Sequence, residues 1–417
     1  MKPIVSTLKD IYPDSQLEAQ AERYRKAEGS FAEYFGGIGE HRFFSAPGRT
    51  EICGNHTDHN NGRVFAASVD LDVIAVAEYT DDNCITIKSE GFAEDKISLS
   101  ELDVVPDEKN TSASLIRGVA DGFVKNGFKI GGFRAYTTSN VMKGSGLSSS
   151  AAFEVLIGTI LSHMFNDGQI PAPKVAQIAQ YAENVYFGKP SGLMDQMASS
   201  VGGFVAIDFK ETESPVIEPV PCDFESYGHA LCIVDAKGDH ADLTDEYSAI
   251  PNEMKEIAHF FDCDNLRQLS LPDIVLNINE LRSSFGDRAV LRAIHFFNEN
   301  ERVEKVVHAL KQGCFEDFLS SVKESGDSSF KYLQNVYANG DVTHQCLSIA
   351  LNIAESSLHR KGACRVHGGG FAGTIQAFVP LDSLKEFKLN MEKIFGTNSC
   401  HVLTVRPIGG TEVIAEG

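Results

Sequence analysis

The sequence lacks the features of a secreted or membrane-spanning protein. Its nine cysteines are scattered and include no CxxC pair, which favours reduced, buried thiols over disulfides or a zinc site. No apolar run reaches the ~18 residues that cross a bilayer. The opening MKPIVSTLKD also has no apolar core of signal-peptide length. We therefore expect a cytoplasmic protein without a membrane partner.

Positive charge is scarce as well. The 37 lysines and arginines are outnumbered by 58 acidic residues, which gives a net charge of −21. Such a surface repels nucleic acid and anionic lipid, so we expect small-molecule partners instead. We also expect a monomeric chain. An anionic substrate would need a local positive site.

Two common catalytic motifs are absent. There is no GxxxxGK[ST] phosphate loop and no GxSxG nucleophile elbow. The absence of the elbow removes an esterase interpretation for the run RVHGGGFAG at 365–373. Three consecutive glycines there still indicate a backbone that bends close to another group, although a tight hairpin would also explain part of the pattern.

The 417 residues exceed one ordinary core and predict two domains, at 1–209 and 210–417. The polar, proline-rich stretch 210–221 lies at the boundary. Strand and helix patterns alternate without a regular βαβ order, which predicts an α+β fold. The patterns indicate strands at 64–79, 83–90 and 202–209, and helices at 15–35, 112–127, 144–165, 172–188, 247–261, 273–284, 287–299, 301–311 and 343–359.

The stretch APGRTEICGNHTDHNNG, at 46–62, concentrates charged and polar side chains. Its HTDH run overlaps the HxHxDH ligand pattern of binuclear metallohydrolases. The first histidine of that pattern would fall on Gly54, which cannot bind a metal, and this counts against the metallohydrolase interpretation.

The run KGSGLSSSAA, at 143–152, precedes a long apolar helix. Backbone N–H groups and the helix dipole would converge there on an anion, and the serine hydroxyls add donors. A serine-rich N-cap with no ligand would give the same pattern.

Together these runs resemble the GHMP small-molecule kinases, and more narrowly the galactokinases. Pro47-Gly48-Arg49 and the segment 54–60 are in register with the galactokinase signature. GLSSSA at 146–151, GGGFAG at 368–373 and Met194-Asp195-Gln196 match further family motifs. The resemblance implies an N-terminal ribosomal-S5-like domain, a C-terminal ferredoxin-like domain, and an active site in the cleft between them.

The resemblance also implies roles for individual residues in an ATP- and Mg²⁺-dependent sugar 1-kinase. Asp195 would accept or orient the anomeric hydroxyl, and Arg49 would stabilise the transferring phosphoryl group. Ser150 and Glu183 would hold Mg²⁺. The expected ATP-phosphate residues are Lys143, Gly144, Ser145, Gly146, Leu147, Ser148, Ser149, Ser150 and Ala151. The expected sugar-binding residues are Arg49, Asn55, His56, Asp58, Gly192, Asp195 and Tyr247. An ordinary aromatic at a helix start is the less favoured alternative for Tyr247.

Four positions depart from the galactokinase pattern. Glu51 replaces asparagine, Asn55 replaces glutamate, His59 replaces tyrosine and His367 replaces threonine. The family glutamate at position 55 accepts a hydrogen bond from the sugar 6-hydroxyl. A neutral amide there would also admit a 6-carboxylate, so galactose and galacturonate both remain possible substrates. A non-catalytic sugar sensor is a further alternative, but the serine-rich loop is intact.

Overall fold

The computed structural model describes residues 5–37, 39–142, 146–238, 243–371 and 373–415. In these residues the larger sheet has the order β1-β13-β2-β3-β6-β4-β5, with β7 paired to β3 and β8 paired to β7. Its strands are β1 (Val5–Thr7), β2 (His41–Cys53), β3 (Arg63–Tyr79), β4 (Cys84–Ser89), β5 (Glu94–Ser98), β6 (Phe133–Ser139), β7 (Phe204–Asp208), β8 (Val216–Pro219) and β13 (Thr411–Ile414). The long strands β2 and β3 pair antiparallel along most of their length and form its centre.

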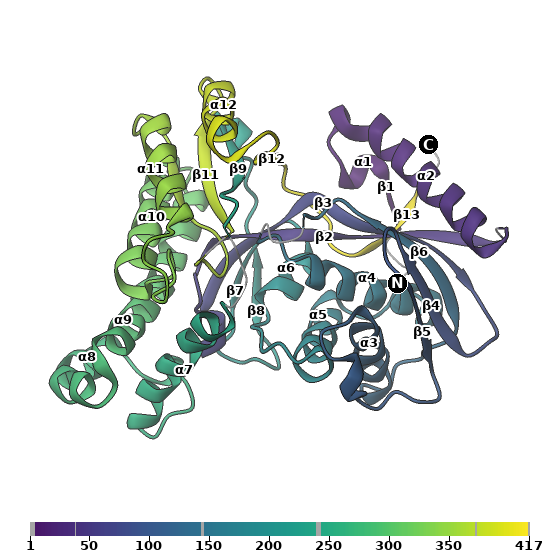
Figure 1. The fold of residues 1–417 in the computed structure, drawn as a ribbon, viewed down its shortest axis with the longest axis horizontal. Coiled ribbons are helices and arrows are strands. Elements are labelled where there is room, and N and C mark those ends of the chain that lie inside the picture. The colour runs from purple at the N-terminus through teal and green to yellow at the C-terminus, as the bar shows by residue number, and fades with distance from the viewer. Residues whose placement is uncertain (1–4, 38, 143–145, 239–242, 372, 416–417) are drawn as a thin grey trace.

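Helices cover both faces of this sheet (Figure 1). On one side lie α1 (Leu8–Ile11) and α2 (Leu17–Phe35). On the other lie α3 (Ser112–Lys125), α4 (Ser149–Phe165), α5 (Ala172–Tyr181) and α6 (Met194–Val201). Because β3 is covered on both faces, nearly all its residues are buried and its sequence reads as a continuous apolar run.

The smaller sheet is antiparallel, with the order β10-β11-β9-β12. Its strands are β9 (His229–Asp235), β10 (Ala363–Val366), β11 (Thr374–Pro380) and β12 (Cys400–Leu403). The remaining helices are α7 (Thr244–Phe260), α8 (Leu271–Leu276), α9 (Ile278–Lys311), α10 (Phe315–Ser328), α11 (Cys346–Leu358) and α12 (Leu384–Phe395). In Figure 1, α10, α11 and α12 stand beside this sheet.

The predicted α+β class is confirmed, but three details of the helices were wrong. The sequence predicted separate helices at 287–299 and 301–311, whereas α9 is continuous there. The polar Glu299 and Asn300 resembled a break between helices, but both side chains are buried within α9. Helix α10 was missed because serines occupy part of its buried face and hide the apolar period. Helix α12 was missed as well.

The division at 209/210 stays a prediction. Two strands beyond it, β8 and β13, pair within the larger sheet, so the chain returns to its first half at the end. None of the described helices is both long and apolar enough to cross a membrane.

Candidate active site

The fold brings the three polar or glycine-rich runs together. The Arg49 backbone N–H, on β2, donates to the Leu147 carbonyl just before α4, at 3.1 Å. Gly146 has a φ of +69°, and a Cβ on it would lie 2.9 Å from Nδ1 of His367. Glycine is therefore needed where the serine-rich run meets the loop between β10 and β11.

Arg49 and Asp195 form an ion pair at this junction. Arg49 Nε lies 2.6 Å from Asp195 Oδ1, and Arg49 Nη1 also donates to the Gly146 carbonyl. The Ser148 hydroxyl donates to the second carboxylate oxygen. Burial alone would raise the pKa of Asp195, but Arg49 and Ser148 outweigh it and lower that pKa. Asp195 is therefore an ionised acceptor at neutral pH.

Glu183 is the centre of a second polar cluster. It is 1% exposed. Its Oε1 accepts the Ser150 hydroxyl at 3.0 Å and the Lys189 ammonium at 2.8 Å. Its Oε2 accepts from the Ser191 hydroxyl and the Gln196 amide, both at 2.7 Å. A carboxylate and a hydroxyl are oxygen ligands of the kind that Mg²⁺ prefers, and the bound ammonium shows that the place suits a cation.

A second carboxyl group lies behind this cluster. Gln196 Nε2 also donates to Glu154 Oε2, at 3.1 Å. Burial, and then the neighbouring Glu183 charge, raise the pKa of Glu154 well above its usual range. Among the described residues, nothing bonds Glu154 Oε1 or Gln196 Oε1. A protonated Glu154 carboxyl group would carry an O–H donor, which an ionised carboxylate lacks.

The first turn of α4 begins between these two clusters. Ser149, Ser150 and Ala151 provide N–H groups that have no partner within the helix, and the dipole of a 17-residue helix adds positive potential. Such a helix terminus binds phosphate groups. Lys143, Gly144 and Ser145 lie outside the described residues.

The segment after β2 supplies the predicted sugar contacts. Nε2 of the His56 ring lies 3.1 Å from the Gly369 carbonyl oxygen, and the ring stacks on that of His59. A carbonyl can only accept, so Nε2 carries the proton and Nδ1 is an acceptor. That buried Nδ1 has no partner among the described residues. Burial, and then the neighbouring His59, lower the His56 pKa to about 3.

Asp58 lies directly against Gly192, one of the expected sugar-binding residues. A Cβ on Gly192 would lie 1.7 Å from Asp58 Oδ2, so the glycine allows this carboxylate to approach the segment that leads to Asp195. Tyr247, on α7, donates its hydroxyl to the Gly370 carbonyl at 3.0 Å. The tyrosine therefore contacts the third glycine-rich run.

Asn55 lies in a network of buried polar groups. It has no exposed surface. Its Nδ2 donates to Glu51 Oε1 at 3.0 Å and to the Gly368 carbonyl at 2.8 Å. Its Oδ1 accepts from Ser329 and Asn335 at 3.1 and 2.9 Å. The sugar-facing role remains a prediction, and in this conformation the whole amide is bound by protein groups.

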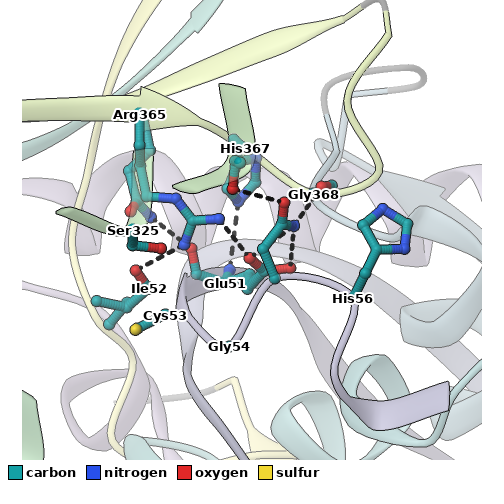
Figure 2. A network of polar contacts seen from close by, with 12 residues as sticks. Glu51, Ile52, Cys53, Gly54, His56, Ser325, Arg365, His367 and Gly368 are labelled. Atoms are coloured by element: carbon teal, nitrogen blue, oxygen red, sulfur yellow. Dashed lines mark hydrogen bonds and ion pairs between the residues drawn. The ribbon is translucent and has the colours of Figure 1, made fainter. Parts of the chain in front are cut away.

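The same network contains a buried ion pair that the sequence did not predict. Arg365 Nη2 lies 2.8 Å from Glu51 Oε1, and His367 Nε2 accepts the Glu51 backbone N–H at 3.3 Å. Figure 2 shows both side chains directed at the segment that carries Glu51. Lys189 was also missed, although it is the only basic residue between Glu183 and Asp195.

Comparisons with known proteins agree with this geometry. Residues 114–203 match the family model of the GHMP kinases N terminal domain, and residues 29–79 match that of the galactokinase galactose-binding signature. The galactokinase of Actinobacillus pleuropneumoniae serotype 5b is 30% identical over 357 residues, which cover 85% of this chain and 89% of that protein. The galactokinase of Clostridium tetani is 27% identical over 385 residues, covering 91% and 94%.

Solved structures show the same fold. The galactokinase of Lactococcus lactis, determined in complex with galactose, matches with a TM-score of 0.80 at 24% identity, covering 93% of this chain and 99% of that chain. The mevalonate kinase of Methanococcus jannaschii matches with a TM-score of 0.62 at 15% identity, covering 88% and 99%.

Proposed function

Because the chain belongs to the galactokinase family of the GHMP kinases, we propose that it is a sugar kinase that phosphorylates the anomeric 1-hydroxyl of galactose with ATP. The observation that carries this proposal is the Arg49–Asp195 ion pair beside the first turn of α4. The Asp195 carboxylate can accept a hydrogen bond or proton from a sugar hydroxyl, and the Arg49 guanidinium is a cation. Both lie next to a helix terminus of the kind that binds phosphate, and phosphoryl transfer needs these groups together.

In this mechanism Asp195 orients the sugar hydroxyl and can accept its proton, since Arg49 keeps the carboxylate ionised. Arg49 also supplies positive charge where negative charge develops on the transferring group. The two roles belong to one unit, because the guanidinium and the carboxylate hold each other in place.

The first turn of α4, from Ser148 to Ala151, would bind the ATP phosphates through its N–H groups. The oxygens of Ser150 and Glu183 are of the kind that binds Mg²⁺, and Glu183 already attracts the Lys189 ammonium. A bound Mg²⁺ would neutralise phosphate charge.

For the sugar, we propose contacts from Asp58, from the acceptor Nδ1 of His56 and from Tyr247. A second candidate, a sugar with altered C6 chemistry such as galacturonate, requires Asn55 to face the sugar. In this conformation the buried Asn55 amide is bound by Glu51, Gly368, Ser329 and Asn335, which does not favour this candidate. The intact Arg49, Asp195 and Glu183 argue against a non-catalytic sugar sensor.

The test is a panel of free sugars, including galactose and galacturonate, incubated with ATP and Mg²⁺. ADP release identifies the substrate, and NMR locates the phosphate on the sugar. Transfer to a 1-hydroxyl supports the proposal. The proposal is contradicted if none of the sugars leads to ADP release, or if the phosphate is found on another hydroxyl.

A further inference from the structure

A lysine outside the family motifs lies beside the carboxylate proposed to hold the metal. The Lys189 ammonium is 2.8 Å from Glu183 Oε1, and the same oxygen accepts the Ser150 hydroxyl at 3.0 Å. A metal bound by Ser150 and Glu183 would therefore compete with Lys189 for this oxygen. The ammonium would need another anion when the metal is present.

Lys189 is placed to reach such an anion. Its side chain is 53% exposed, whereas that of Glu183 is 2% exposed, so the ammonium lies on the solvent side of the carboxylate. A nucleotide that enters the site from solvent can meet it there.

The backbone of Lys189 is fixed while its side chain is not. Gly188, with a φ of +84°, ends the turn at 182–187, and the Lys189 N–H donates to the Glu183 carbonyl at 3.1 Å. Pro190 follows directly. The flexible four-carbon stem of lysine can move the ammonium away from Glu183 without a backbone change.

The local charges call for one more cation. The Lys189 ammonium lies 2.8 Å from the Glu183 carboxylate. Arg49 already pairs with Asp195. A polyphosphate brought next to Glu183, Asp195 and Asp58 would meet carboxylates, and Lys189 is the cation that a metal bound at Glu183 would release to it.

On the basis of the proposed kinase function, we propose that Lys189 binds the terminal phosphate oxygens of ATP, leaving Glu183 when the metal takes that carboxylate. In this role Lys189 provides a charge-assisted contact that AMP cannot use, because AMP lacks the outer phosphates.

The experiment measures nucleotide binding by calorimetry in Mg²⁺ buffer without sugar. Wild type, Lys189→Met and Lys189→Arg are titrated with ATP, ADP and AMP. Lys311→Met is the matched control, because Lys311 also forms an exposed ion pair with a glutamate, Glu218, but on the surface of α9. Thermal melts check that each variant is folded, and Lys189→Gln is a second neutral variant.

We expect Lys189→Met to weaken ATP binding about tenfold or more, the loss expected for a hydrogen bond between charged groups. The loss should be smaller for ADP and absent for AMP. Lys189→Arg should keep most of the affinity, and Lys311→Met should match wild type.

Unchanged ATP affinity in Lys189→Met and Lys189→Gln would overturn the inference, and so would an equal loss for all three nucleotides. In either case wild type would still bind ATP, and the proposed function would stand. A wild-type protein that binds no ATP would overturn both.

Discussion

Arg365, at the end of β10, donates to the Glu51 carboxylate on β2 at 2.8 Å, with the two side chains 0% and 3% exposed. The pair joins the smaller sheet to the larger one. Removing one partner leaves a buried charge without compensation, which typically costs ~3–5 kcal/mol. We expect Arg365→Met or Glu51→Gln to lower the free energy of unfolding by about this amount. Urea denaturation measures the loss.

The exposed pair between Arg282 and Asp287, with side chains 54% and 67% exposed, provides the control. Arg282→Met should cost less than ~1 kcal/mol. Similar losses in the buried and the exposed pair would mean that the Glu51–Arg365 contact is open to water in solution.

Asn55→Glu would place a second carboxylate against Glu51, because Asn55 Nδ2 lies 3.0 Å from Glu51 Oε1 in a site without solvent. Two like charges there should destabilise the protein by several kcal/mol. The exchange variant Glu51→Asn/Asn55→Glu keeps a single carboxylate and should unfold at a higher temperature than Asn55→Glu alone. Thermal unfolding of the two variants and wild type tests this order. If the exchange variant unfolded at the lower temperature, the side chains at positions 51 and 55 would not be in contact in solution.

Asp195→Asn and Arg49→Ala should each lower kcat by about a hundredfold or more, with a smaller effect on sugar affinity. The double variant should lose less than the sum, since the ion pair acts as a unit. Because Arg49 holds the pKa of Asp195 below its usual range, Arg49→Met should raise that pKa, and the residual activity should decline at a higher pH than in wild type. Rate profiles between pH 4 and 8 measure the shift, and coincident acid limbs would contradict it.

Ser150→Ala and Glu183→Gln should raise the Mg²⁺ concentration needed for half-maximal activity, because each removes one protein oxygen from the proposed metal site.

Glu154→Gln should behave differently from these two variants. Because burial and the Glu183 charge favour the protonated form of Glu154, the neutral glutamine should replace it, and activity should change less than about threefold. Mg²⁺ titrations of the three variants decide this. A large loss in Glu154→Gln would mean that Glu154 works as a carboxylate.

Acid stability should depend on Glu299. Burial opposes its ionisation, but Arg302, His295 and Arg365 outweigh this effect and lower the pKa to about 2. The unfolded chain titrates near ~4.3, so the ionised group contributes ~3 kcal/mol above that pH. This stability is lost as pH falls from ~4 toward 2.

The comparison of wild type with Glu299→Gln tests this dependence. Their unfolding free energies should differ most near pH 7, and the difference should shrink as pH falls from ~4 toward ~2, where folded wild type also carries a neutral side chain. Glu256→Gln, at an exposed position of α7, is the control for net charge. A difference that stays constant across pH would assign the effect to packing.

The sequence predicted the α+β class and most helices of the first half, because apolar periods and glycine or proline boundaries mark them locally. The neighbourhood of Arg49 and Asp195, 146 residues apart, came only from the family resemblance. No local pattern distinguishes a buried arginine from an exposed one, so Arg365 was read only as the start of a glycine run. Lys189 was missed for a related reason, since its proposed role depends on its contact with the Glu183 carboxylate, which no local sequence pattern shows.

The pairing of β1 with β13 determines how the chain can be assembled. These strands lie parallel, with Val5 opposite Glu412 and Thr7 opposite Ile414, and β13 also borders β2. During synthesis the larger sheet therefore lacks one strand until residues 411–414 have been made. The edge of β2 stays without that partner through translation of the entire second half, a period in which an unpaired edge can associate with other chains.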